Sequence, residues 1–348
     1  MKQRAFLVKA ARLIWYNVLV LFCLVFVCEL GFRWFQPNYT YYEQAVTANF
    51  HKKAVHQMDT NWLCPDPLLG WVCQSKTPLK FYHPDFEHIQ YGINAQGFRN
   101  TMNFDTLPEK SDAKRILLLG DSFLFGLFLA DHQTISSCLQ QRLPPSYEVY
   151  NLAIPAWGLD QMQVAYQHYL DSIQPDLSIL FYIDDDVSRV VEAFFWGAST
   201  KPTFELEADQ LRPKPAEAGR LHRITEFFVF QSKMFNAIYK GYCQQKARPI
   251  ATRLIQQMAA SEQQQGRQLL ALRCPRIQQL GETYTPPFDL REDIAPFPLS
   301  YTDLADTIRR LEAAEREALY IPEDGHLSVA GAEFICELLY KQIRTAVE

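Results

Sequence analysis

The stretch Arg115–Gly126 reads RILLLGDSFLFG, and it decides how the rest of the chain is interpreted. Four consecutive aliphatic residues form a short apolar run that is typical of a parallel strand buried on both faces. Asp121 and Ser122 follow almost at once, and a second apolar run ends at Gly126. Asp and Ser are favoured at helix N-caps. The pair therefore predicts either a simple helix start or a strand that ends at a cleft and presents Ser122 to a substrate.

The segments that follow alternate between strand and helix patterns. Strands are expected at 148–154, 177–183 and 268–273, and helices at 131–143, 159–172, 247–264, 302–316 and from Ser328 onward. This alternation predicts parallel βαβ units and an α/β sheet. Residues 188–246 interrupt the pattern, so we expect an insertion there, with a hairpin in PTFELEADQLRP.

The N-terminus has the composition of a membrane anchor. MKQRAFLVKAAR is basic and has no acidic residue, and LIWYNVLVLFCLVFVC then continues without a charge. With ELGFRWF the run approaches the roughly 20 residues that a membrane helix needs. Basic flanks stay in the cytoplasm, so the rest of the chain would lie across the membrane. A cleaved signal peptide is the alternative, but the expected cleavage site lacks small residues.

Bulk composition narrows the class of protein. The chain has 348 residues, about half of them hydrophobic, and a net charge of -5. A sizeable core is therefore expected, and nucleic acid is not an expected partner. Cys64 and Cys73 bracket a turn-rich segment and predict a disulfide; Cys243 with Cys274 is a second candidate pair. Cys138 and Cys336 lie on apolar helical faces, and we expect buried thiols there.

Polar residues follow three of the expected strands, where parallel sheets bind ligands. GDSF follows the first strand, NLAIPAWG the second and DDDVSR the third. Near the C-terminus, IPEDGHLSVAG places His326 two residues after Asp324. The order serine, acid, histidine suits a nucleophilic triad in an α/β fold. The alternative is that His326 is a surface residue beside a helix capped by Ser328.

These motifs resemble those of the SGNH (GDSL-type) hydrolase superfamily. The resemblance rests on GDSF with its following glycine, an Asn-led turn after the second strand, and D-x-H near the C-terminus. DPLLGW and INAQGFRN resemble the region before the hydrolase domain in membrane-anchored bacterial members, which are associated with exopolysaccharide acylation. The resemblance covers roughly residues 64–340. It implies a three-layer α/β/α sandwich with a parallel sheet, here with one N-terminal transmembrane helix.

The resemblance also assigns catalytic roles to residues of this chain. Ser122 would be the nucleophile, His326 the general base and Asp324 the acid that orients the imidazole. Families with the acid three residues before the histidine point to Glu323 instead. The first oxyanion donor would be the backbone N–H of Ser122. A second would come from Ala156 at the usual glycine position, with Gly158 as the alternative loop glycine.

The third oxyanion donor is the weak point of the resemblance. Asp185 stands where the superfamily has asparagine, within Asp184–Asp186. An ionised aspartate would repel an oxyanion, so Asp185 would have to be protonated, which predicts an acidic pH optimum. Divalent-cation binding is a second interpretation, although consecutive strand-end side chains diverge and no metal site is expected. In a third interpretation of these residues, one of the acids caps the next helix and the others face water.

The sequence thus predicts a serine esterase or O-acyltransferase acting on O-acyl groups, most simply acetyl, of envelope or extracellular glycans. No cofactor is expected. The alternative is a catalytically impaired glycan-binding or scaffold protein of a polysaccharide assembly complex, which would have assembly proteins as partners. The expected organisation is a cytoplasmic tail (1–12), a membrane anchor (13–35), a lead-in region of loops and short strands (36–110) and an extracytoplasmic hydrolase-like domain (111–348) with the insertion at 188–246.

Overall fold

The computed structural model describes most of the chain in two compact units. The smaller unit comprises residues 1–51 and 218–242, and the larger comprises 52–217 and 243–348. The described residues are 2–35, 62–75, 79–83, 86–100, 102–107, 112–192, 194–195, 199–201, 203–214, 220–281, 288–322 and 324–347.

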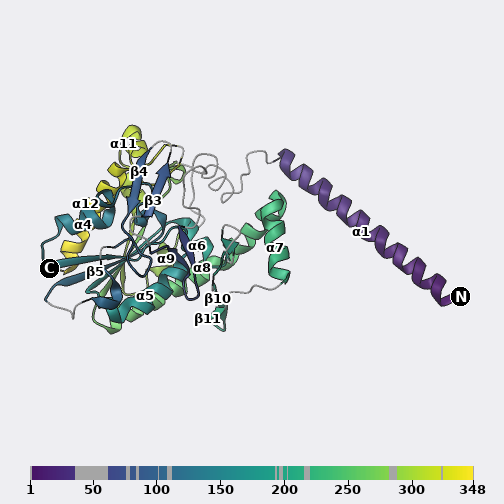
Figure 1. Ribbon diagram of the computed structural model, residues 1–348, viewed down its shortest axis with the longest axis horizontal. Helices are drawn as coiled ribbons and strands as arrows, with labels where there is room; N and C mark the ends of the chain where they lie inside the picture. Colours follow the sequence, from purple (N-terminus) through teal and green to yellow (C-terminus); the bar gives the residue numbers. More distant parts are fainter. Residues whose placement is uncertain are drawn as a thin grey trace. The chain divides into compact units, whose positions relative to one another are not determined.

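The larger unit is built on a five-stranded sheet whose neighbouring strands all pair in parallel (Figure 1). The strand β5 lies between β6 and β7. The next strand in the chain, β6, therefore pairs with one side of β5, and the strand after it, β7, pairs with the other side. In open α/β sheets this is the place where ligands bind, at the carboxyl ends of the strands. In spatial order the strands are β13 (Leu299–Asp303), β12 (Gln268–Arg273), β7 (Leu177–Tyr182), β5 (Lys114–Leu119) and β6 (Tyr147–Asn151).

Helices cover both faces of this sheet, which confirms the predicted three-layer α/β/α class. Figure 1 shows α4 (Ile135–Arg142) and α12 (Val329–Val347) on one face and α5 (Leu159–Ile173) on the other. The last turns of α8 (Lys233–Gln264) pack beside α5. Every residue of β7 is buried, as expected for a strand covered on both faces.

A buried hydrogen-bond group joins α8, α5 and the sheet. The Glu262 carboxylate of α8 accepts hydrogen bonds from the hydroxyls of Tyr166 in α5 and Ser178 in β7, at 2.6 and 2.9 Å. A buried acid needs such partners, because an unpaired polar group costs free energy away from water. The group therefore holds α8 against this face of the sheet.

Short elements connect the central ones. Antiparallel hairpins precede the sheet, and the expected hairpin in the insertion is confirmed by the pairing of β10 with β11. The hairpins are β1 (Leu63–Asp66) with β2 (Gly70–Cys73), β3 (Leu79–His83) with β4 (Phe86–Tyr91), β8 (Phe194–Phe195) with β9 (Ser199–Thr200), and β10 (Thr203–Glu207) with β11 (Gln210–Lys214). The short helices are η1 (Phe104–Thr106), α3 (Ser122–Phe125), η2 (Asp131–Gln133), α6 (Asp184–Arg189), η3 (Ile277–Leu280) and α9 (Arg291–Ile294).

The end of the chain differs from the expectation of one helix at 302–316. Residues 299–303 form the edge strand β13, and the helical part is divided into α10 (Leu304–Ile308) and α11 (Ala313–Ala318). The strand is short and only partly buried, so its own pattern is weak. It forms because β12 offers a free edge with which it pairs over five residues, from Leu299 to Asp303.

The predicted cysteine pairing was wrong. Cys138 of α4 and Cys336 of α12 form a disulfide, with their Cα atoms 6.2 Å apart. Cys64 and Cys73 are free thiols. In the β1–β2 hairpin Cys64 lies opposite Val72, and Cys73 opposite Leu63. The two cysteines are thus one position out of register, and successive side chains of a strand point to opposite faces.

Cys243 and Cys274 are buried and are not disulfide-bonded. They were the second candidate pair, and that expectation is also wrong. Both lie inside the larger unit, where a small uncharged thiol packs as an apolar side chain.

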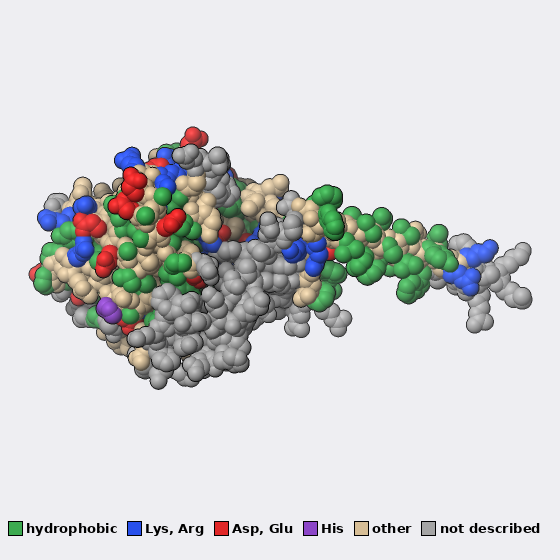
Figure 2. Space-filling view, turned by 90° about the horizontal axis from the view of Figure 1, so that it is seen from above, with side chains coloured by type: hydrophobic (Ala, Val, Ile, Leu, Met, Phe, Trp, Pro, Cys, Tyr) green, Lys and Arg blue, Asp and Glu red, His purple; other side chains and the backbone are tan. Residues whose placement is uncertain are grey.

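In the smaller unit, α1 (Lys2–Phe35) contains a candidate membrane span, Arg12–Phe35, with a mean hydropathy of 2.3. None of this span is buried inside the protein. Figure 2 shows hydrophobic side chains along the helix and basic side chains toward its N-terminal end. The span is long and apolar enough to cross a bilayer. The same unit contains α7 (Arg220–Gln231) and the first turns of α8.

Candidate active site

Ser122 begins helix α3 directly beyond the end of β5. The Asp121 carboxylate caps this helix by accepting a hydrogen bond from the backbone N–H of Phe123 at 2.9 Å. Gly126 ends it in the left-handed conformation (φ 76°), where a side chain would meet Thr134. The two interpretations of GDS are therefore compatible: Asp121 caps the helix, and the resulting tight turn presents Ser122.

Ser122, His326 and Asp324 form one hydrogen-bonded chain. His326 Nε2 lies 2.8 Å from Ser122 Oγ, and His326 Nδ1 lies 2.5 Å from Asp324 Oδ1. The same carboxylate oxygen accepts a hydrogen bond from the backbone N–H of His326 at 3.0 Å. The Asp324 side chain is 26% exposed and that of His326 13%. The other candidate acid, Glu323, lies outside the described residues.

Aromatic rings hold the imidazole from two directions. The ring of Phe123 lies 5.0 Å from that of His326, and the ring of Phe128 meets it edge-on at 5.6 Å. Phe128 has a positive φ of 69°. Its backbone N–H donates to the hydroxyl of Tyr91 at 3.1 Å, so the lead-in region supports this conformation.

The loop after β6 brings Ala156 into a conformation that favours glycine. Ala156 has φ 64°, whereas Gly158 has φ -97° and stands at the N-cap of α5. Two tryptophans hold the loop: the Trp71 indole donates to the carbonyl of Pro155 at 3.1 Å, and the Trp157 indole donates to that of Trp71 at 3.0 Å. Left-handed backbone is unfavourable for alanine, so these contacts must support it.

The insertion is attached close to this loop. Lys201 Nζ lies 2.5 Å from Asp160 Oδ2 in the first turn of α5, and both side chains are buried. Removing one partner of a buried ion pair is costly, because the remaining charge stays buried without a partner. The pair therefore ties the chain just before β10 to the helix that follows the loop.

The three consecutive acids have three different environments. Asp184 is buried against Arg273, whose Nε lies 2.6 Å from its Oδ1. Asp185 is 32% exposed and forms an ion pair with Arg276. Asp186 is buried, and its Oδ2 accepts the backbone N–H of Ile183 at 2.9 Å, a contact that caps α6. One acid thus caps the helix as expected, but Asp184 does not face water.

Asp186 also belongs to a buried cluster beside the serine. Arg189 Nη1 lies 2.5 Å from Asp186 Oδ1 and 3.3 Å from Asp121 Oδ2, and that same Asp121 oxygen lies 3.3 Å from Ser122 Oγ. Both carboxylates are fully buried and share this one guanidinium. Burial and the neighbouring Asp121 raise the pKa of Asp186 well above its usual range, against the opposing effect of Arg189. Burial likewise raises the pKa of Asp184, against the opposing effect of Arg273.

The cations that neutralise these acids were missed by sequence reasoning. Arg189 stands three residues after Asp186, a spacing that brings side chains together on a helix, so its pairing could have been predicted. Arg273 and Arg276 lie at and beyond the end of β12. Their partners are about 90 residues away in sequence, and only the pairing of β12 with β7 brings them together.

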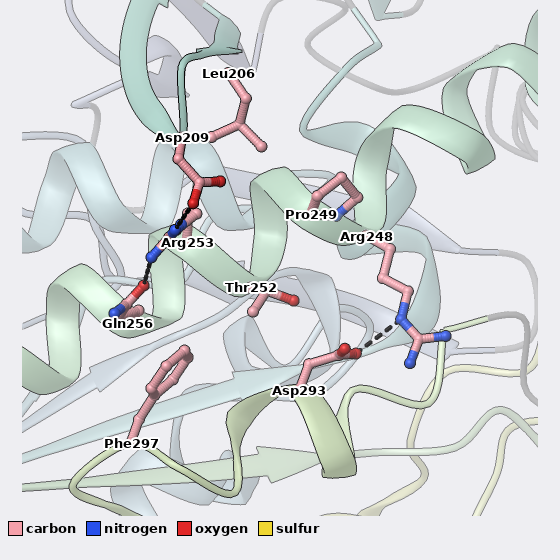
Figure 3. Close-up of a pocket in the computed structure, with 9 residues that line it drawn as sticks. All are labelled: Leu206, Asp209, Arg248, Pro249, Thr252, Arg253, Gln256, Asp293 and Phe297. Atoms are coloured by element: carbon pink, nitrogen blue, oxygen red, sulfur yellow. Dashed lines mark hydrogen bonds and ion pairs between the residues drawn. The ribbon is translucent and has the colours of Figure 1, made fainter.

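A separate hollow of about 330 Å³ lies between the β10–β11 hairpin, α8 and the region of α9 (Figure 3). Its two arginines are held by carboxylates: Arg253 by Asp209 and Arg248 by Asp293, at 2.6 and 2.7 Å. None of its nine lining residues is a predicted site residue. The hollow is lined by Leu206, Asp209, Arg248, Pro249, Thr252, Arg253, Gln256, Asp293 and Phe297.

Comparison with known proteins finds similarity in solved structures. No protein-family model matches the chain, and no curated protein matches it. A structure of TesA is 14% identical, with a TM-score of 0.44; the match covers 67% of this chain and 100% of that one. An acetyl xylan esterase, AlAXEase, is 11% identical, with a TM-score of 0.42 and coverage of 66% and 99%. A lipase/acylhydrolase from Enterococcus faecalis is 11% identical, with a TM-score of 0.40 and coverage of 67% and 96%.

Proposed function

We propose that this chain is a serine ester hydrolase of the SGNH type. The observation that carries the proposal is the chain from Ser122 Oγ through His326 to Asp324, with distances of 2.8 and 2.5 Å. A serine hydroxyl is a weak nucleophile until a base is positioned to take its proton. Here the base contacts the hydroxyl through one ring nitrogen and an orienting acid through the other.

The first half of the reaction forms an acyl-enzyme. Ser122 Oγ attacks the carbonyl carbon of the ester while its proton moves to His326 Nε2. Asp324 stabilises the imidazolium by accepting the hydrogen bond from Nδ1. The tetrahedral intermediate then collapses, the bond to the leaving alkoxide breaks, and that oxygen takes the proton from Nε2. In the second half, water repeats these steps and releases the carboxylic acid.

The negative oxygen of the intermediate needs donors, and we assign two backbone groups to it. These are the N–H of Ser122, at the start of α3, and the N–H of Ala156, in the turn supported by the tryptophans. The role considered for Asp185 required a neutral acid. Its ion pair with Arg276 stabilises the ionised form instead, so the proposed oxyanion hole consists of backbone donors.

The test is hydrolysis of p-nitrophenyl acetate between pH 5 and 9 by the purified chain and its Ser122→Ala variant. We expect the variant to lose at least ~10³-fold in kcat/KM, because the nucleophile is absent.

Ser146→Ala is the matched control. Ser146 is exposed in the turn before β6. It lies at the amino ends of the parallel strands, whereas Ser122 lies at their carboxyl ends, so full activity is expected. Equal hydrolysis by wild type and Ser122→Ala, with both folded, would contradict the proposal.

The finer assignment is an extracytoplasmic enzyme, anchored by α1, that removes or transfers O-acyl groups of glycans. The Cys138–Cys336 disulfide supports an oxidising compartment, and the basic flank of the span supports a cytoplasmic N-terminus. Support for a glycan substrate comes from the resemblance of GDSF, DPLLGW and INAQGFRN to anchored members of the superfamily. Incubation with O-acetylated polysaccharide and measurement of released acetate tests this assignment.

Transfer to a sugar hydroxyl uses the same acyl-enzyme and differs only in the acceptor. An assay with an activated acetyl donor and an unacetylated glycan separates the two: acetylated sugar indicates transfer and free acetate indicates hydrolysis. The alternative of a glycan-binding scaffold within an assembly complex is favoured by one observation, the charged Asp185 at the asparagine position. Glycan binding that persists in Ser122→Ala, without turnover by wild type, would support it.

A further inference from the structure

The smaller unit carries an apolar face in addition to the membrane span. On α7 the exposed apolar residues recur at i, i+3 and i+4, and on the start of α8 at i, i+3 and i+7, so each group lies on one side of its helix. The rings of Phe228 and Phe235 lie 5.3 Å apart, which joins the two groups into one surface. This surface, here called the aromatic face, consists of Ile224, Phe227, Phe228, Phe235, Ile238 and Tyr242.

The corner between α7 and α8 is fastened to α1 by Glu29. The Glu29 carboxylate accepts hydrogen bonds from the backbone N–H groups of Lys233 and Met234, both at 3.0 Å, and from the hydroxyl of Ser232 at 2.7 Å. Arg33 Nε adds an ion pair at 2.6 Å. A side chain of α1 therefore caps the first turn of α8, some 200 residues along the chain.

Glu29 stands inside the candidate span, six residues before its end at Phe35. That distance is about 9 Å along a helix, so the carboxylate lies near the edge of the hydrocarbon layer. An acid at this depth is costly unless it has partners. Besides Arg33 of α1, the partners of Glu29 are the groups of the α7–α8 corner, so both helices must lie at the depth of that membrane boundary.

We propose that the aromatic face lies in the lipid headgroup region and is a second membrane contact beside the span. The occupant follows from continuity with the span and from charge. Residues 220–242 contain four basic residues and one acidic residue. This excess of three positive charges suits anionic lipid headgroups. The charged residues are Arg220, Arg223, Lys233, Lys240 and Glu226. The proposal rests on membrane spanning by α1.

The test is photocrosslinking of the full chain in bilayer discs of phosphatidylcholine with about a quarter phosphatidylglycerol. A benzophenone amino acid replaces Phe228 or Ile238 in the aromatic face, Leu21 in the span, or Lys341, which is 68% exposed on α12. We expect lipid adducts at 228, 238 and 21, each at least about fivefold above the yield at 341, because only these three positions contact lipid.

The controls separate the possible failures. No lipid adduct at 21 would overturn the span itself, whereas adducts at 21 without adducts at 228 and 238 would overturn the second contact alone. Chain-to-chain crosslinks at 228 and 238 in place of lipid adducts would assign the aromatic face to a second copy of this chain. Glu29→Ala should lower the adduct yield at 238 severalfold and leave that at 21 unchanged; an unchanged yield at 238 would overturn the fastening role of Glu29.

Discussion

Arg99 Nη1 lies 2.8 Å from the carbonyl oxygen of Gly126, the residue that ends the turn presenting Ser122. The same guanidinium donates to the carbonyls of Phe125 and Leu129, at 2.9 and 2.7 Å, and is stacked on the Tyr91 ring at 4.3 Å. Arg99 belongs to the lead-in region and is almost fully buried. A residue outside the sheet therefore satisfies the carbonyl groups on which the conformation of the serine turn depends.

Arg99→Lys should destabilise the protein by about 1–3 kcal/mol, because an ammonium cannot reproduce the planar fork and buried carbonyls lose their donors. Thermal unfolding in detergent measures the change. Arg142→Lys is the matched control, since Arg142 is 42% exposed and its ion pair with Glu337 lies at the surface. Equal unfolding temperatures for the two variants would show that the Arg99 contacts are not stabilising.

Asp324→Asn should lower kcat/KM for p-nitrophenyl acetate by roughly 10²–10⁴-fold, because an amide cannot hold the imidazole in the required tautomer or stabilise its charged form. Glu323→Gln is the matched control and should keep activity within about threefold. The reverse result would identify Glu323 as the orienting acid. Circular dichroism of both variants checks that the fold is kept.

Asp186→Asn should change how stability depends on pH. Burial beside Asp121 raises the pKa of Asp186, so the folded state binds a proton more tightly than the unfolded state. The contribution of Asp186 is therefore complete below the unfolded pKa near 4 and is lost as pH rises through the folded pKa. Relative to Asp186→Asn, wild type should lose up to about 1.4 kcal/mol per pH unit in that window. Denaturation of both proteins from pH 4 to 8 measures the difference, and parallel curves would contradict the raised pKa.

Ala156→Gly should keep activity within about threefold, because glycine adopts φ 64° without strain and retains its N–H. Ala156→Val should lower kcat/KM at least ~10-fold, because a β-branched residue resists this conformation and should displace the proposed oxyanion donor. Initial rates with p-nitrophenyl acetate compare the variants. Full activity of Ala156→Val would show that the backbone at 156 does not contribute to the site.

The Cys138–Cys336 disulfide predicts six reactive thiols in the denatured chain without reductant and eight after reduction. Replacing both cysteines by serine should cost about 2–5 kcal/mol, since the bond joins positions 198 residues apart and restricts the unfolded chain. Thiol titration and thermal unfolding measure the two effects. Eight reactive thiols without reductant would contradict the bond.

Much of the fold and the candidate site residues Ser122, Asp324 and His326 could be proposed from the sequence because their signals are local. An apolar run such as RILLL is typical of a buried parallel strand, and the acid after it caps a helix by a contact two residues away. Ser122 and His326 were identified by two short motifs, GDSF and D-x-H, taken together in their order along the chain. Their separation of 2.8 Å then follows because β5 and the loop before α12 end at the same edge of the sheet.

The sequence by itself therefore determined the α/β class, the candidate nucleophile and base, and the apolar N-terminal helix, and it left Asp324 and Glu323 open as the acid. Only the tertiary structure decided how the acids Asp184–Asp186 are neutralised, which cysteines pair, and where the strand β13 forms. Charge pairing, disulfide bonding and strand addition all depend on groups far apart in the chain. Arg273 contacts Asp184 across 89 residues and Cys138 meets Cys336 across 198, so the partners appear only when packing brings their elements together.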